Sequence, residues 1–170
     1  MKRAVLVGLP GAGKSTVGRI VAQALDWDFV DLDAEIERRA GRSIADLFAT
    51  EGESAFRTLE RELTLELCSG SRLVVAPGGG WAAQPGHLDQ LPPDSAVIWL
   101  QVSPAEAIRR LRGSPVERPL LAGADPVGAL EALAEQRTEH YAQADLTVPV
   151  DGRSAAEAAE IITTWLERST

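Results

Sequence analysis

The stretch that decides the fold lies near the N-terminus and reads Gly8-Leu9-Pro10-Gly11-Ala12-Gly13-Lys14-Ser15, a match to the pattern GxxxxGKS. An apolar run at residues 3–7 precedes it, and residues 14–25 after it space their apolar side chains as a helix does. Glycines let the loop backbone wrap phosphate oxygens, and the start of the next helix favours the same negative charge. An ordinary glycine-rich turn would not predict the lysine or the hydroxyl. The stretch therefore predicts a nucleoside triphosphate site.

Each part of the loop has an expected role in this site. Lys14 is placed to bridge the terminal phosphates, and the hydroxyl of Ser15 is a ligand for Mg²⁺. Thr16 can add a phosphate contact one residue further along the chain. The backbone amides expected to meet the phosphates belong to the loop residues Gly11, Ala12 and Gly13.

Beyond the loop, short apolar runs alternate with longer amphipathic stretches, as in parallel strands joined by crossover helices. The predicted strands cover residues 3–7, 29–31, 73–76, 96–102 and 146–150. The predicted helices cover residues 14–25, 104–111, 126–143 and 154–167, with shorter helices between Ile36 and Leu67. Serines at 103 and 154 are the expected N-caps of two of these helices. At 170 residues, the chain is predicted to be one α/β domain, residues 1–170.

Composition excludes several classes of partner. The formal net charge of -8 argues against general attraction to nucleic acid or to an anionic membrane.

The sequence also predicts neither a secretory signal nor a membrane span. Pro10, Gly11 and Gly13 interrupt the first apolar run too early for a secretory signal, and no run reaches the roughly 20 apolar residues of a membrane span. Cys68 is the only cysteine, so an intramolecular disulfide is impossible. We expect a cytoplasmic protein that acts as a monomer on small molecules.

A phosphate loop alone does not identify the reaction. A guanine-reading switch uses an NKxD element, and this chain contains no asparagine. Residues 125–128 match DxxG, but they begin a predicted helix, and chance explains the match better than a switch element does. Oligomeric ATP-driven machines need a larger domain and a hydrophobic strand that ends in two acids. This chain is too short and lacks such a strand, so that class is excluded. A kinase for a small acceptor remains.

Two carboxylates follow the second predicted strand, at Asp31 and Asp33. Alternation along an extended segment sends them in different directions, so they can serve different ligands. Strand ends face the phosphate loop in an open α/β sheet, so we expect one acid to support Mg²⁺ and the other to meet an acceptor hydroxyl. Asp33 also precedes a predicted helix, so a capping role is an alternative for it.

Two segments interrupt the alternation and are predicted to be loops, residues 77–85 and 112–126. The first contains three consecutive glycines directly after a strand, and the second is punctuated by proline and glycine. Loops on a rigid scaffold often carry function, so both are candidates for the site.

The ordered set of motifs resembles that of shikimate kinase and covers nearly the whole chain. In chain order, these motifs are the phosphate loop, Asp31-Leu32-Asp33, Gly41-Arg42-Ser43-Ile44, Glu51-Gly52-Glu53, Phe56-Arg57 with Glu60, Gly78-Gly79-Gly80, Arg118-Pro119-Leu120-Leu121, and Arg137 before Tyr141. The resemblance implies a three-layer P-loop kinase fold with a five-stranded parallel sheet, a helical substrate-binding segment at 33–61 and a lid at 112–125. It implies transfer of the γ-phosphoryl of ATP to the 3-hydroxyl of shikimate, in aromatic amino-acid biosynthesis.

On the acceptor side, Arg57 and Arg137 match the family's carboxylate-binding arginines. Asp33 matches the acid that meets the ring hydroxyls and orients the attacking oxygen or accepts its proton. The remaining part of the implied substrate site is the glycine strip, which consists of Gly78, Gly79 and Gly80. Gly79 matches the glycine whose backbone meets the substrate.

On the nucleotide side, Arg118 matches the lid arginine that stabilises charge during transfer. Arg110 and Arg153 match positions near the adenine, although Arg109 or Arg112 could take the place of Arg110. The implied Mg²⁺ ligands are Ser15 and Asp31.

Two other functions stay open at this stage. The first is a kinase for another small acceptor, such as gluconate or a nucleoside monophosphate. The second is a regulatory module that binds the nucleotide without transferring phosphate. Trp81 either packs at the acceptor pocket or covers the loop, and we favour packing. Cys68 and the two histidines receive no catalytic role.

Overall fold

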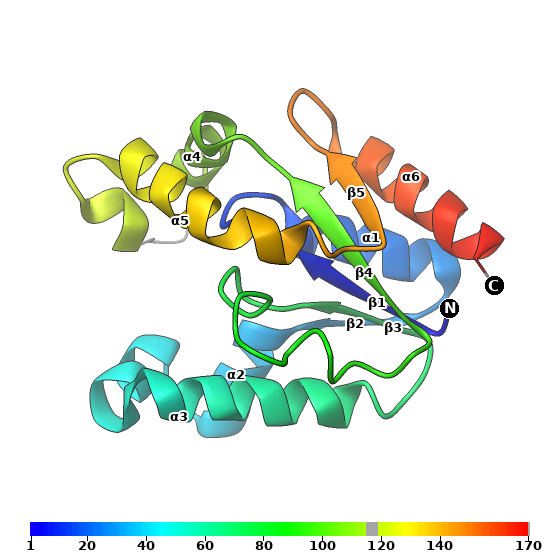
Figure 1. The fold of residues 1–170 in the computed structure, drawn as a ribbon, viewed down its shortest axis with the longest axis horizontal. Coiled ribbons are helices and arrows are strands. Elements are labelled where there is room, and N and C mark those ends of the chain that lie inside the picture. The colour runs from blue at the N-terminus through cyan, green and yellow to red at the C-terminus, as the bar shows by residue number, and fades with distance from the viewer. Residues whose placement is uncertain (115–118, 170) are drawn as a thin grey trace.

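The computed structural model describes residues 1–114 and 119–169, and in that part of the chain six α-helices flank one five-stranded sheet (Figure 1). Every strand pair is parallel, and the strand order is β2-β3-β1-β4-β5. The strands are β1 (Arg3–Val7), β2 (Asp28–Asp31), β3 (Leu73–Ala76), β4 (Ser95–Gln101) and β5 (Leu146–Pro149). The predicted α/β class and parallel sheet are confirmed.

The helices form a layer on each face of the sheet. They are α1 (Lys14–Leu25), α2 (Leu32–Ala40), α3 (Ile44–Leu67), α4 (Pro104–Arg112), α5 (Pro126–Tyr141) and α6 (Ala155–Arg168), with a 3₁₀ turn at Pro119–Ala122. Helices α1 and α6 pack on one another, while α2, α3 and α5 lie on the opposite side (Figure 1). Tyr141 of α5 packs on Trp99 of β4, with ring centroids 5.8 Å apart. None of the helices described is long and apolar enough to cross a bilayer.

The central strands are buried along their whole length. All residues of β1 and β3 are shielded from solvent, as their runs of valine, leucine and alanine predict for parallel strands covered on both faces. Strand β4 alternates instead, with Ile98 and Leu100 fully buried and Val97 and Trp99 half-buried. The loops that follow β1 and β3 are therefore fixed on the most rigid part of the molecule.

Side-chain caps set the helix boundaries. Ser103 accepts a hydrogen bond from the amide of Glu106 and starts α4, and Ser154 forms a capping box with Glu157 at the start of α6. Asp125 accepts from the amide of Gly128 at 3.0 Å and starts α5. The DxxG match thus lies at the start of a helix, as predicted, and its aspartate is the N-cap of that helix. Helix α5 ends at Tyr141, two residues before the predicted end.

Helix α3 is two helical pieces joined at Gly52. This residue has φ 82° and ψ 168°, a conformation that side chains other than hydrogen rarely allow. The two pieces on either side of this break agree with the shorter helices that the sequence predicts in this region. The break also lets the second piece, which carries Arg57, take a direction of its own.

Gly18 of α1 offers a test of the packing between α1 and the sheet. A methyl group there would lie 2.5 Å from Cε2 of Phe29 and 3.1 Å from Cδ1 of Leu6. We expect Gly18→Ala to lower the free energy of unfolding by about 1–2 kcal/mol, because overpacking outweighs the gain in helix propensity. Gly70→Ala meets only one backbone atom, at 3.6 Å, and is the control in the same urea titration. Equal stability of the two variants would contradict this account of the contact.

Candidate active site

A cleft of about 640 Å³ opens at the carboxyl ends of the strands. One wall consists of the phosphate loop, Asp31, Asp33 and residues 76–79. Residues of α4 and of the connection between β5 and α6 also line the cleft, including Arg110 and Arg153. This is the edge where open α/β sheets bind ligands. The structure thus brings the predicted phosphate loop, both acids and two glycines of the strip into one space.

The phosphate loop is held tightly against α4. At Gly11, φ is 83°, and a Cβ atom would lie 2.6 Å from the carbonyl oxygen of Ala107. The loop ends at Gly13, which precedes the first turn of α1. Amide groups at a helix N-terminus are suited to bind an anion, so the loop has the form expected of a phosphate site.

The side chain of Lys14 is held against this loop and lines the cleft. Its Nζ donates to the carbonyl oxygens of Gly8 at 2.8 Å and Leu9 at 3.0 Å. Both contacts hold the ammonium group beside the loop, on the cleft side. A cation at this position can neutralise terminal phosphate oxygens.

Ser15 and Asp31 are in direct contact, since the hydroxyl of Ser15 donates to Oδ2 of Asp31. The other oxygen of Asp31 accepts from the amide of Ala34 at 3.2 Å, so Asp31 is the N-cap of α2. The capping alternative for Asp33 is therefore wrong: that residue lies in the first turn of the helix. The pair presents a hydroxyl and a carboxylate, the oxygen ligands that suit Mg²⁺.

Asp33 points toward the glycine strip. A Cβ atom on Gly78 would lie 3.1 Å from its Oδ1. Burial, together with the nearby charge of Asp31, raises the pKa of Asp33 above the ordinary carboxyl value, while Lys14 and Arg57 act in the opposite direction. A carboxyl group with a raised pKa beside the phosphate loop is suited to accept a hydrogen bond or a proton from an alcohol.

Arg57 and Arg137 converge on the same strip from α3 and α5. A Cβ atom on Gly80 would lie 2.8 Å from Nη2 of Arg57 and 3.3 Å from Nη2 of Arg137. A Cβ atom on Gly79 would lie 3.0 Å from Nη1 of Arg137. The guanidinium groups thus occupy space that side chains would otherwise fill. Two adjacent guanidinium groups form a site for a carboxylate or phosphate.

Glu60 is a site residue to which the sequence assigned no role. Its side chain is fully buried, and one oxygen accepts from Nη1 of Arg57 at 2.6 Å. The other oxygen has no hydrogen-bond partner among the described residues. Burial raises the pKa of Glu60 to about 7, although Arg57 opposes the shift. The sequence signal for Glu60 is its spacing of three residues from Arg57, which suits an ion pair on a helix but does not show that the side chain of Glu60 is buried.

Tyr141 fixes the backbone of the strip from α5. Its hydroxyl donates to the carbonyl oxygen of Gly79, and its ring is buried. The indole of Trp81, next to the strip, is also buried and lies 5.3 Å from the ring of His87. Trp81 is not among the residues that line the cleft.

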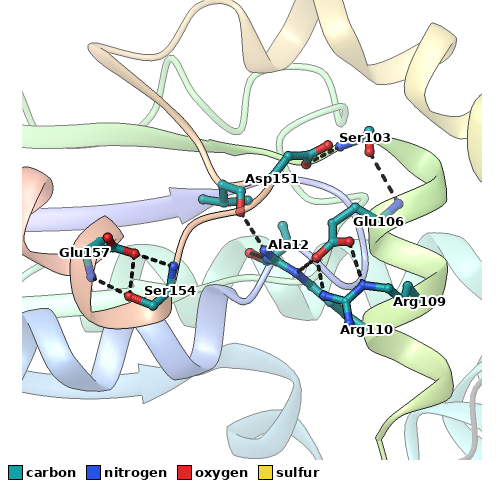
Figure 2. A network of polar contacts seen from close by, with 9 residues as sticks. Ala12, Ser103, Glu106, Arg109, Arg110, Asp151, Ser154 and Glu157 are labelled. Atoms are coloured by element: carbon teal, nitrogen blue, oxygen red, sulfur yellow. Dashed lines mark hydrogen bonds and ion pairs between the residues drawn. The ribbon is translucent and has the colours of Figure 1, made fainter.

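At the end of the cleft near α4, Arg110 is the arginine of this helix that donates a hydrogen bond to the phosphate loop. Its guanidinium donates to the carbonyl oxygens of Val150 at 2.6 Å and Ala12 at 3.4 Å (Figure 2). The side chain of Arg109 is 73% exposed, and Arg112 is exposed as well. Arg153 donates to the carbonyl oxygen of Pro149 at the cleft edge. Arg118 lies outside the described residues.

The raised pKa of Glu60 predicts a dependence of stability on pH. Between pH 4.5 and about 7 the folded state binds more protons than the unfolded state, so stability falls as pH rises. The full loss is on the order of 3 kcal/mol. Glu60→Gln cannot ionise, so its stability relative to the parent is expected to be higher at pH 8 than at pH 5, as measured by urea unfolding.

Glu66→Gln is the control for this experiment. A hydrogen bond from Arg39 lowers the pKa of Glu66, so Glu66 is ionised in both the folded and the unfolded state between pH 5 and pH 8, and its replacement is expected to leave the difference in relative stability between these pH values near zero. The same pH response in Glu60→Gln and in the parent would show that Glu60 does not titrate in this range.

Comparison with known proteins agrees with this geometry. The family model described as shikimate kinase matches residues 10–167. The shikimate kinase of Synechococcus sp. strain RCC307 is 46% identical over 157 residues, covering 92% of this chain and 80% of the relative. The enzyme of Symbiobacterium thermophilum is 43% identical, covering 96% of both chains.

A solved structure gives the same result for the fold. The shikimate kinase from Acinetobacter baumannii in complex with shikimate superposes with a TM-score of 0.89 at 33% identity, covering 100% of this chain and 95% of the other. The matched model spans the phosphate loop from Pro10, the acids after β2, the glycine strip and both converging arginines. This chain therefore belongs to the shikimate kinase family.

Proposed function

We propose that this protein transfers the γ-phosphoryl group of ATP to the 3-hydroxyl of shikimate, giving shikimate 3-phosphate on the route to chorismate and the aromatic amino acids. The observation that carries the proposal is the convergence of Arg57 and Arg137 on Gly79 and Gly80, beside Asp33 and the phosphate loop. Shikimate bears one carboxylate and three hydroxyls. A pair of guanidinium groups suits the first, and a carboxylate acceptor suits the others.

The chain's residues divide the work of phosphoryl transfer between binding and positioning. The amides of Gly11, Ala12 and Gly13 bind the phosphates, Thr16 adds a further phosphate contact, and Lys14 neutralises the terminal phosphates. Asp33 holds the attacking hydroxyl in line and accepts its proton or its hydrogen bond. Phosphoryl transfer needs little covalent chemistry from the protein, so this arrangement of charges supplies most of the catalysis.

Mg²⁺ is the cofactor that fits this site. Ser15 and Asp31 would hold it, because their oxygens meet at the start of α1 and the hydrogen bond to Ala34 fixes the carboxylate. Mg²⁺ bound there would neutralise negative charge on the phosphates during transfer. The same two oxygens suit a hard cation that retains several waters.

We also propose that residues 1–170 form one kinase domain with a substrate-binding segment at 33–61 and a lid at 112–125. Arg57 in the first segment lies against the glycine strip and is paired with Glu60, which supports the assignment of this segment. Arg118 belongs to the second segment, and its role over the phosphates rests on the motif Arg118-Pro119-Leu120-Leu121. The single cysteine, which is buried, supports a cytoplasmic setting.

The test is release of ADP from MgATP with and without shikimate, with identification of the phosphorylated product. We expect rapid release only with shikimate, and none above background in Lys14→Met, whose fold is checked by circular dichroism. Gluconate and nucleoside monophosphates run in parallel, since each presents an anion and a hydroxyl or phosphate acceptor. Turnover with one of these compounds and not with shikimate would identify that compound as the acceptor. ATP binding without any acceptor-dependent turnover would favour a regulatory module.

Arg57→Lys tests the carboxylate site while keeping the positive charge. Lysine lacks the two-pronged geometry of arginine, so we expect the KM for shikimate to rise about tenfold, with the KM for ATP unchanged. Arg61→Lys, an exposed position one turn further along α3, is the control. Steady-state kinetics with each substrate varied in turn measures both constants. An unchanged KM for shikimate would remove Arg57 from the carboxylate site.

A further inference from the structure

Glu106 lies at the centre of a charged network on the first turn of α4 (Figure 2). Its carboxylate accepts from Nε and Nη2 of Arg109 at 2.7 and 2.6 Å. It also accepts from Nε of Arg110 at 2.9 Å. The side chain of Glu106 is 18% exposed, and that of Arg110 is 25% exposed. The contact between Glu106 and Arg110 is therefore partly shielded from water.

Arg110 joins three segments that are far apart in the sequence. Glu106 holds its Nε from α4, while its two terminal nitrogens donate to Val150 after β5 and to Ala12 in the phosphate loop. The carbonyl oxygens of Val150 and Ala12 are neutral acceptors. The carboxylate of Glu106 is the charged partner, and charge-assisted hydrogen bonds are about twice as strong as neutral ones.

The position of Glu106 is itself fixed. Ser103 caps α4 by accepting from the amide of Glu106 at 3.3 Å. The amide of Ser103 donates in turn to Oδ1 of Asp151 at 2.9 Å, in the same connection that contains Val150. The start of α4 and the connection after β5 are thus linked twice, once through Ser103 and once through Arg110. Hydrogen bonds from Arg109 and Arg110 lower the pKa of Glu106 to about 2, so it is ionised at neutral pH.

From this network we infer that Glu106 is a positioning residue for nucleotide binding, which holds the guanidinium of Arg110 at the adenosine end of the cleft. The inference rests on the proposed function, in which Arg110 lies near the adenine. Arg110 lines the cleft together with Val150, Arg153 and Ala155. Without Glu106, two neutral carbonyl contacts remain to orient a long, flexible side chain. Loss of Glu106 would therefore weaken the binding of the nucleoside part of the nucleotide, since Lys14 and the loop amides bind its phosphates.

The chain offers a matched control on α2. Glu35 accepts from Arg38 and Arg39 at the same spacing of three and four residues, and its side chain is 19% exposed. Hydrogen bonds from Arg38 and Arg39 also lower the pKa of Glu35 to about 2. Glu35 does not line the cleft. Glu35→Ala therefore removes an equivalent helix ion pair without touching the network around Arg110.

The experiment measures the dissociation constants of MgADP and of inorganic tripolyphosphate by calorimetry, without acceptor. Glu106→Ala is expected to weaken MgADP about tenfold, the cost of one charge-assisted hydrogen bond, with tripolyphosphate changed less than about twofold. Glu35→Ala is expected to leave both constants unchanged. Glu106→Gln, which retains an oxygen acceptor, is expected to recover part of the loss. Thermal unfolding of the two alanine variants checks that both lose similar stability.

Three results would overturn the inference: unchanged MgADP affinity in Glu106→Ala, an equal loss in Glu35→Ala, or an equal loss for tripolyphosphate and MgADP. The last would mean that Glu106 acts on the phosphate loop as a whole. Because acceptor is absent from these measurements, their outcome is independent of whether shikimate is the substrate. Failure of the proposed function would appear instead in the assay of ADP release.

Discussion

The backbone of the phosphate loop approaches its neighbours so closely that glycine is required there. At Gly8 a Cβ atom would lie 2.6 Å from the carbonyl oxygen of Leu100, and at Gly11 it would lie 2.6 Å from that of Ala107. The loop is therefore seated on β4 and α4 and not merely attached to β1. Since β1 is the central strand of the sheet, the loop that follows it lies in the middle of the row of strand ends at which the cleft opens.

Charge balance organises the acceptor side around the same loop. Two guanidinium groups and Lys14 bring positive charge, while Asp31, Asp33 and Glu60 bring negative charge within a half-buried space. Burial and mutual repulsion among these acids explain the raised pKa values of Asp33 and Glu60. The three cations named here balance the three acids in a chain whose overall charge is -8, so the attraction for an anion depends on where the two guanidinium groups lie and not on an excess of positive charge.

The parts of the site that depend on backbone conformation could be predicted from the sequence, and the parts that depend on packing could not. The GxxxxGKS loop and the alternation of apolar runs predicted the sheet and the position of the cleft. Residue spacing did not distinguish whether Asp31 or Asp33 caps α2, because capping depends on where the first helical turn begins. It did not show which of three arginines on α4 faces the loop, because one residue of shift rotates a side chain by about 100°. The full burial of Glu60 arises from contacts across the fold.

Helix α5 carries two functional groups one turn apart, Arg137 and Tyr141. The first points its guanidinium at Gly79 and Gly80, and the second binds the carbonyl of Gly79. The glycine strip itself belongs to the loop after β3, so the hydroxyl of Tyr141 joins α5 to a loop that the central sheet carries. A displacement of α5 away from the sheet would break this hydrogen bond and withdraw the guanidinium of Arg137 from the strip in the same movement. The hydrogen bond of one tyrosine thus keeps the distance between Arg137 and the strip fixed.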